Sequence, residues 1–143
     1  MKLTIFAPVL FSMFVTAANA DPWLCVGKVS TGFAFQNKKW EQTKFNVENE
    51  RYILRKLKEG EQFFGAKAQT YGLFILGNDT SGLPCDDVSQ PGMFICLSSS
   101  LEFKFSTKSG RFLMTHTAGY WEGKDDADNP LFISIGRCSK LGE

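Results

Sequence analysis

LEFKFSTKSGRFLMTHT, residues 101–117, decides the fold class, because it contains two strand-like runs and the turn between them. Leu101–Phe105 and Arg111–Thr117 are rich in apolar residues at alternating positions, and the polar segment Ser106–Gly110 joins them. The two phenylalanines of the first run share one face, where an aromatic residue of the second run can pack on them. The stretch predicts an antiparallel β-hairpin.

A second stretch of the same kind lies near the amino terminus. Residues 32–40 read GFAFQNKKW, with Phe33 and Phe35 on one face of a strand and Trp40 on the returning strand. The polar residues Gln36–Lys39 have the length of a hairpin loop. Two similar hairpins are therefore expected, whether by duplication or by convergence on the same packing.

Other segments of the chain carry strand signals, separated by polar turns. The segment 50–58 is interpreted as a strand, with a helix as the alternative that its composition leaves open. The clearest loops are Gly77–Pro84 and the acidic segment Gly123–Pro130. Besides the segments above, the expected strands are Trp23–Ser30, Trp40–Val47, Gln62–Ala68, Thr70–Leu76, Met93–Leu97, Leu131–Cys138 and a short continuation at Gly119–Trp121.

The number and spacing of these strands predict the architecture. About eight to ten short strands and no clear amphipathic helix are typical of an all-β fold. We expect a single small antiparallel barrel or sandwich, and the sequence does not choose between the two. The many phenylalanines favour an interior filled by side chains.

The first twenty residues resemble a secretory signal. Lys2 precedes an apolar run, Leu3–Val15, and the segment ends in Ala18-Asn19-Ala20, which is an A-x-A cleavage pattern. We therefore expect residues 1–20 to be a cleavable signal peptide and residues 21–143 to form one β domain. No later stretch is long and apolar enough to predict a membrane span.

Four cysteines follow the expected cleavage point. An even number in an exported chain predicts two disulfides, for which three pairings exist. We favour Cys25 with Cys138, which would join the first strand to the last, and Cys85 with Cys96, which flank a short hairpin. A zinc site is disfavoured, because there is no CxxC pair and a single histidine.

Composition excludes several classes of protein. The chain has 143 residues, of which 43% are hydrophobic and 22% charged, so it is neither disordered nor of low complexity. Its formal net charge is +1, and Lys2 is the only charged residue of the leader. A neutral domain lacks the basic surplus that nucleic-acid binding requires.

The sequence offers little catalytic apparatus. His116 is the only histidine, and on an alternating strand Thr115 and Thr117 would face away from it. We therefore predict a protein that is not an enzyme and needs no cofactor or metal, with a hydrolase built on His116 as the weakest alternative. Three carboxylates in the loop 123–130 could in principle hold a cation, but a solvated turn is the simpler interpretation.

One pair of aromatic residues stands out as a candidate for binding. Tyr120 and Trp121 lie beside the acidic loop, and Gly119 and Gly123 bracket them. Aromatic side chains at a loop edge are typical anchors of protein contacts. We nevertheless expect both rings to be buried at the end of the sheet, and their exposure as a binding anchor is the alternative. His116, Tyr120 and Trp121 are thus the weak binding candidates of this sequence.

The chain resembles a group of small exported proteins of Gram-negative bacteria, especially proteobacteria, whose function is unknown. This resemblance implies a periplasmic or secreted location, supports the pairing of the first and last cysteines, and implies no ligand or functional residue. The residues that carry it are Cys25, Thr31–Phe33, Trp40, Phe45, Tyr52-Ile53, Gly110–Phe112, Gly119-Tyr120 and Ile133–Ser139.

A superficial likeness to periplasmic lysozyme inhibitors rests on the leader, the cysteines and the β pattern. The serine-glycine-x-x-tyrosine inhibitory stretch of that family has no counterpart here. The leading functional expectation is a non-enzymatic, periplasmic or secreted protein-binding module with an envelope or extracellular protein as partner. The alternatives are a lipocalin-like carrier of a small apolar ligand and a lysozyme-inhibitor-like protein.

Overall fold

The computed structural model describes residues 21–63, 69–78, 82–87 and 92–142. The expected signal peptide and most of the expected strand Gln62–Ala68 lie outside these ranges. Within them, no helix is long and apolar enough to cross a membrane.

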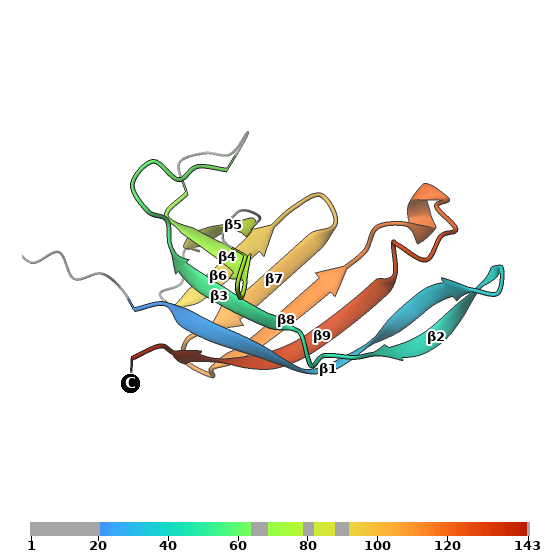
Figure 1. The fold of residues 1–143 in the computed structure, drawn as a ribbon, viewed down its shortest axis with the longest axis horizontal. Coiled ribbons are helices and arrows are strands. Elements are labelled where there is room, and N and C mark those ends of the chain that lie inside the picture. Colours follow the sequence, from blue (N-terminus) through green and yellow to red (C-terminus); the bar gives the residue numbers. More distant parts are fainter. Residues whose placement is uncertain (1–20, 64–68, 79–81, 88–91, 143) are drawn as a thin grey trace, which may run out of the picture.

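The described residues form nine antiparallel strands and one short 3₁₀ turn. Strands dominate and no α-helix occurs in this part of the chain, which confirms the predicted all-β class (Figure 1). The strands are β1 (Trp23–Gln36), β2 (Lys39–Phe45), β3 (Arg51–Lys56), β4 (Tyr71–Ile75), β5 (Gly82–Asp87), β6 (Met93–Leu97), β7 (Leu101–Ser106), β8 (Arg111–His116) and β9 (Leu131–Lys140); the turn η1 is Tyr120–Glu122.

Pairing of the first strand with the last closes the sheet into a barrel. β3 to β9 pair in sequence order, and β1 pairs with β3 on one edge and with β9 on the other. Eight strands therefore form a closed antiparallel barrel, which decides between the barrel and the sandwich. Closure leaves no free edge within the barrel wall.

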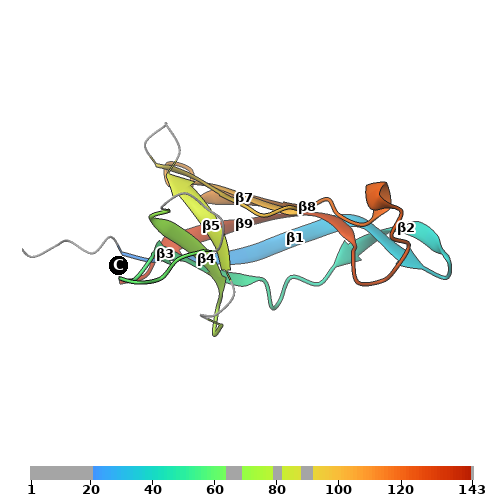
Figure 2. The same ribbon diagram turned by 90° about the horizontal axis from the view of Figure 1, so that it is seen from above.

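The ninth strand, β2, lies outside this ring. β1 has 14 residues, so its second half extends beyond β3 and pairs there with β2. The resulting hairpin projects from the barrel as an arm, together with η1 and the loop that leads to β9 (Figures 1 and 2). Its turn places Asn37 and Lys38 at positive φ, 51° and 62°, as a two-residue hairpin turn requires.

The interior of the barrel is packed with aromatic rings and the two disulfides. Phe103 and Phe105 are fully buried, as are Leu54 and three of the four cysteines. The predicted pairing is confirmed: Cys25 bonds to Cys138 and Cys85 to Cys96, each pair directly opposite in register. The rings of the core contact one another edge to face and in offset stacks.

The structure resolves one ambiguous segment and corrects two predicted boundaries. The ambiguous segment 50–58 forms strand β3, because Leu54 must face the core while neighbouring side chains face outward. Prediction of a loop as far as Pro84 is wrong, since β5 already begins at Gly82 and pairs with β4. The expected strand at 119–121 is also wrong, because Gly119 has a φ of 90° and directs the chain into η1.

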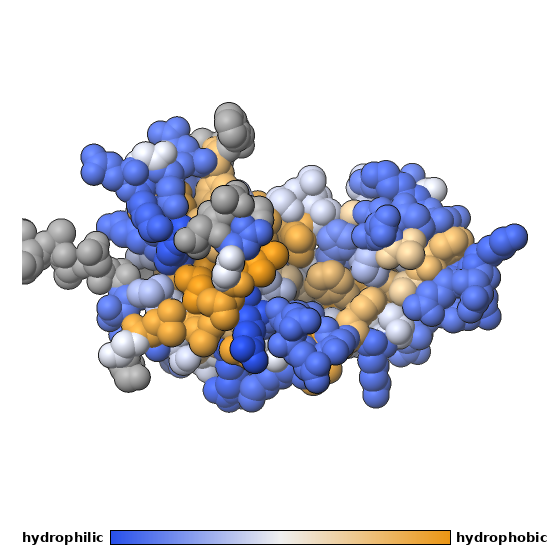
Figure 3. Space-filling view, in the orientation of Figure 1, coloured by the Kyte–Doolittle hydropathy of each residue, from blue (hydrophilic) through white to orange (hydrophobic). Residues whose placement is uncertain are grey.

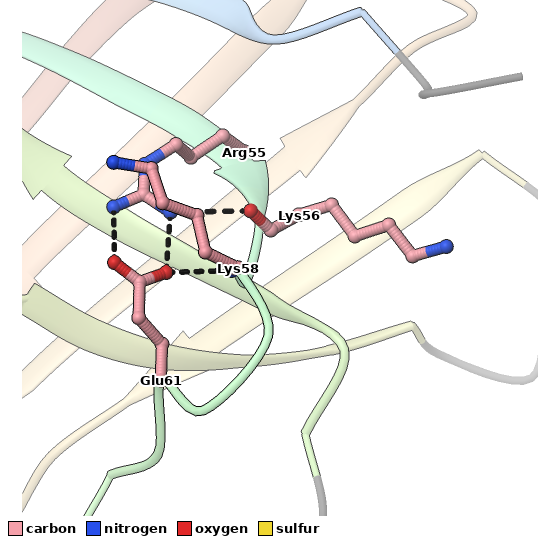
Figure 4. Close-up of polar contacts among 4 residues, drawn as sticks. All are labelled: Arg55, Lys56, Lys58 and Glu61. Atoms are coloured by element: carbon pink, nitrogen blue, oxygen red, sulfur yellow. Dashed lines mark hydrogen bonds and ion pairs between the residues drawn. The ribbon is translucent and has the colours of Figure 1, made fainter. Parts of the chain in front are cut away.

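The segment after β3 is tied back to the barrel by an ion pair. The guanidinium of Arg55 donates two hydrogen bonds to the carboxylate of Glu61, at 2.7 and 2.9 Å (Figure 4). The backbone N–H of Lys58 donates a third, and together these interactions lower the pKa of Glu61 to about 2. Arg55 also lies 4.1 Å from the ring centroid of Phe74, which Phe63 covers from the same segment.

Candidate protein-binding surface

The predicted aromatic pair is exposed on the projecting arm. Tyr120 is 61% exposed and Trp121 74% exposed, in the turn η1. Gly119 and Gly123 both adopt positive φ, which glycine allows and which separates the two rings from the sheet. The expected burial of both rings at the end of the sheet is therefore wrong, and the alternative of exposure is observed.

The loop that carries these rings is held in place by β2. The indole N–H of Trp40 donates a 2.7 Å hydrogen bond to Oδ1 of Asp125, and Tyr120 packs on the same ring. Within the loop, Oδ1 of Asp126 accepts hydrogen bonds from two backbone N–H groups and from the Asn129 amide. Trp121 is thus presented on a fixed turn, which lowers the entropic cost of a contact.

A second exposed apolar feature covers the outer side of β1, β9 and β8. Cross-strand register places Val29, Ile135 and Leu113 in one row and Thr31, Ile133 and Thr115 in the next. Phe33 and Leu131 form a third row toward the arm. We call this set of eight side chains the outer face. Five of them are large hydrophobic residues at least one-third exposed: Val29, Phe33, Leu113, Ile133 and Ile135.

The outer face is hollowed at its arm end. A groove of about 440 Å³ lies over the Thr31–Ile133–Thr115 row, with Phe33 and Gln42 along its side. Isolated apolar residues are common on protein surfaces, whereas a contiguous apolar face usually marks an interaction site. The outer face is therefore a second candidate for contact.

His116 lies on the opposite side of the sheet from the outer face. Its Nδ1 is 2.6 Å from the carbonyl oxygen of Pro130, and its ring stacks on Phe132. Thr115 pairs with Ile133 and His116 with Phe132, so these neighbouring side chains point to opposite faces of β8 as predicted, although both residues contribute to the lining of the groove. The structure does not bring His116 and the Tyr120–Trp121 pair together in one site.

The barrel opens toward the arm through a small apolar hollow. Its volume is about 280 Å³, and Tyr52, Leu73, Leu83 and Met114 are among its lining residues. In Figure 3, hydrophobic residues gather on the barrel half of the molecule. Hydrophilic residues cover much of the loops in the same view. Pockets for drug-sized ligands span about 300–1,000 Å³, so this hollow suits only a smaller molecule.

A polar cluster lies between the barrel and the arm. The hydroxyl of Ser134 is 2.7 Å from that of Ser30 and donates to Oε1 of Glu50 at 3.2 Å. Oε2 of Glu50 is buried without a hydrogen-bond partner in the described structure, and burial raises the pKa of this carboxyl group. Burial, and then the charge of Glu50, raise the pKa of Tyr52 to about 12.

The acidic loop has the geometry of a self-contained turn. Asp125 and Asp126 accept hydrogen bonds from Trp40 and from the loop's own backbone, as described above. Among the described residues, no group of three histidine, cysteine or acidic side chains is placed to hold a metal ion. The interpretation as a solvated turn therefore fits the observed hydrogen bonds.

The fold and the surface together define a class: a small, disulfide-bonded, eight-stranded β-barrel with an exposed aromatic loop and an apolar outer face. Comparison of the chain with protein-family models, with curated proteins and with solved structures gives no match. The two disulfides are consistent with an oxidising, exported location.

The sequence pattern indicates the aromatic loop but not the outer face. Its signal was present, because Leu131, Ile133 and Ile135 alternate with small or polar residues and so share one side of their strand. An amphipathic strand does not reveal whether that side faces a core or the solvent. Which side of β9 faces the solvent depends on its position between β1 and β8 in the barrel.

Proposed function

We propose that this chain is a non-enzymatic, periplasmic or secreted protein-binding module. The observation that carries the proposal is the exposure of Tyr120 and Trp121 on a turn anchored to Trp40. Aromatic side chains contribute much of the binding energy where they are desolvated at the centre of a contact. Two disulfides and a filled core supply the rigid support.

The experiment compares capture by the oxidised protein and by a variant. Immobilised wild-type protein is exposed to an extract of the bacterial envelope, and a captured protein is then titrated to saturation. We expect the variant Trp121→Ala to weaken this binding by at least about tenfold, which corresponds to about 1.4 kcal/mol. Equal affinity of wild type and variant, or no saturable partner, would reject the proposal.

A matched control uses an exposed apolar side chain far from the loop. Leu97 on β6 is 47% exposed, and Leu97→Ala should leave the affinity unchanged. Lysozyme is one defined protein to include in the titration, because of the likeness to lysozyme inhibitors. If the wild-type protein inhibits lysozyme and Trp121→Ala does not, the contact lies on this loop.

The second candidate function is a carrier of a small apolar ligand, and the hollow at the barrel opening favours it. Native mass spectrometry of freshly purified oxidised protein would show a bound mass. A larger side chain in place of Leu83, Leu83→Trp, should then displace that mass by filling the hollow. Protein that is consistently free of added mass would remove this candidate.

A further inference from the structure

Three cations line a hollow at the barrel end of the outer face. Lys28 lies where the β1–β9 register shifts, and Arg111 and Arg137 are register partners on β8 and β9. Together with Ile135 they line a volume of about 280 Å³. All three cations are exposed, and none forms an ion pair with another described residue. Such neighbouring like charges favour the approach of an anionic group.

Three carboxylates mark the opposite end of the outer face. Asp125, Asp126 and Asp128 form no ion pair within the described part of the chain, whereas Lys124 pairs with Glu122 at 2.6 Å. Asp125 is bonded to Trp40, which is the register partner of Phe35 on β1. The acidic loop therefore lies where β1 continues beyond Phe33.

The two charged ends are equally distant from the middle of the outer face. Its central row is Thr31–Ile133–Thr115, and Arg137 lies four residues beyond Ile133 along β9. Phe35, which marks the acidic end, lies four residues beyond Thr31 along β1. At about 3.3 Å per residue, each end is about 13 Å from the central row.

We propose that the outer face is the two-fold interface of a homodimer. A rotation of 180° about an axis through the central row places the apolar rows of two copies against each other. The same rotation places the Lys28–Arg111–Arg137 end of one copy against the acidic loop of the other. The contact then forms twice, as a closed two-fold interface requires.

Charge complementarity selects a second copy over other occupants. On β1, β9 and β8 the surface is uncharged in the middle, basic at one end and acidic at the other, and Lys44 of β2 lies beside Thr31 at its edge. Such a surface is complementary to itself when reversed. Residues 21–143 carry equal numbers of basic and acidic side chains, so two copies do not repel each other overall. The inference goes beyond the proposed function, because it uses a different surface from Tyr120 and Trp121.

Sedimentation of the oxidised protein over a range of concentrations tests the proposal. We expect a monomer–dimer equilibrium whose dissociation constant rises on the order of tenfold between low and high salt, since the charged ends are screened. Monomer at every concentration, or a series of species larger than a dimer, would overturn the proposal. A monomer with a bound lipid mass would also overturn the proposal, because an anionic amphiphile and not a second copy would then occupy the outer face.

Two matched variants localise the contact. Ile133 and Leu97 are 52% and 47% exposed on barrel strands, and only Ile133 belongs to the outer face. We expect Ile133→Asp to be monomeric and Leu97→Asp to dimerise like the wild type, with both retaining two disulfides and β-sheet circular dichroism. A dimer of Ile133→Asp with wild-type affinity would overturn the proposal.

A charge-exchange experiment tests the arrangement directly. Restored association in a mixture of two variants cannot be explained by a loss of stability in either one. The double variant Arg111→Glu/Arg137→Glu, whose two ends are both acidic, should be monomeric. Ala127→Lys/Asp128→Lys, whose loop then carries two added lysines against Asp125 and Asp126, should dimerise more weakly than the wild type. An equimolar mixture should form a heterodimer more tightly than either variant pairs with itself, because the intact basic end of the second variant meets the intact acidic loop of the first. Failure of the mixture to associate would overturn the two-fold arrangement.

Trp121→Ala separates this inference from the proposed function. The variant should keep the dissociation constant of the dimer within about twofold while it loses the external partner. A monomeric Trp121→Ala protein would show that the aromatic loop, and not the outer face, holds the two copies together.

Discussion

Gly32 lies where β1 and β9 approach each other closely. A methyl group built on its Cα would meet the carbonyl oxygen of Leu131, and Phe132 Cα would lie 2.8 Å away. These are backbone atoms, which cannot move aside as the end of a flexible side chain can. Glycine is therefore required here by the pairing that closes the barrel.

Gly32→Ala is expected to lower the free energy of unfolding by about 1–3 kcal/mol, because β1 must separate from β9 to admit the methyl group. Urea unfolding of the oxidised protein measures the change. Gly123→Ala is the comparison: φ is 72° there and nothing lies within 4 Å, so only backbone strain of about 1 kcal/mol is expected. A larger loss at Gly123 than at Gly32 would contradict this account.

Ionisation of the Glu50 carboxyl group opposes folding, because the group is partly buried. Its raised pKa means that folding favours the neutral carboxyl group. The stability that this group contributes is fully present below its ordinary pKa of 4.5 and is lost as pH rises through the raised value.

We compare the free energies of unfolding of Glu50→Gln and wild type at pH 4 and at pH 7. The difference should favour the variant more at pH 7, where the buried carboxylate of the wild type is charged. The glutamine keeps an oxygen that can accept from Ser134 and removes the buried charge. Glu59→Gln, at an exposed position, should show no such dependence. The same difference between variant and wild type at both pH values would disprove the role of the charge.

At the scale of elements, the segment after β3 depends on the Arg55–Glu61 pair. The lowered pKa of Glu61, about 2 against an ordinary 4.5, means that the pair contributes above pH 4.5. The contribution is lost as pH falls toward 2, because the protonated carboxyl group no longer pairs with the guanidinium. Phe63 of this segment is then expected to separate more easily from the Phe74 ring that it covers.

Glu61→Gln is expected to reproduce this loss at pH 7, with a cost of about 1 kcal/mol, since the pair is partly exposed and screened. Hydrogen exchange at the Lys58 amide, which donates to Glu61, should become faster in the variant. In the wild type the same amide should lose protection between about pH 4.5 and about pH 2, after correction for intrinsic exchange. An unchanged rate in the variant would refute the role assigned to the pair.

The two similar hairpins show what a strand pattern can and cannot predict. In both, the alternation correctly places two phenylalanines on one face. Phe103 is fully buried in the barrel, whereas Phe33 is 49% exposed on the outer face. Alternation indicates which residues share a side, and the order of the strands around the barrel decides which side is inside.

At the scale of the whole molecule, the two disulfides close loops of very different length. Cys25 and Cys138 are 113 residues apart, and Cys85 and Cys96 are 11 apart. A cross-link stabilises mainly by restricting the unfolded chain, and the restriction grows with the logarithm of loop length. The long loop should therefore contribute more.

Cys25→Ala/Cys138→Ala is expected to lower the free energy of unfolding by about 5 kcal/mol, and Cys85→Ala/Cys96→Ala by about 3 kcal/mol. All four side chains are buried, so the loss of packing is similar in the two variants. Denaturant unfolding, with non-reducing electrophoresis to confirm the remaining bond, measures both. The opposite order would show that strand pairing, and not chain entropy, governs these bonds.

The sequence by itself determined the all-β class, most of the strands, the two disulfides and the aromatic pair beside the acidic loop. These follow from local alternation, turn chemistry and cysteine number, which act over a few residues or need no position at all. Only the tertiary structure decided the barrel, the exposure of Tyr120 and Trp121, and the outer face with its charged ends. They depend on which strands are neighbours, and the pairing of β1 with β9 joins residues from 98 (Phe33 and Leu131) to 117 (Trp23 and Lys140) positions apart.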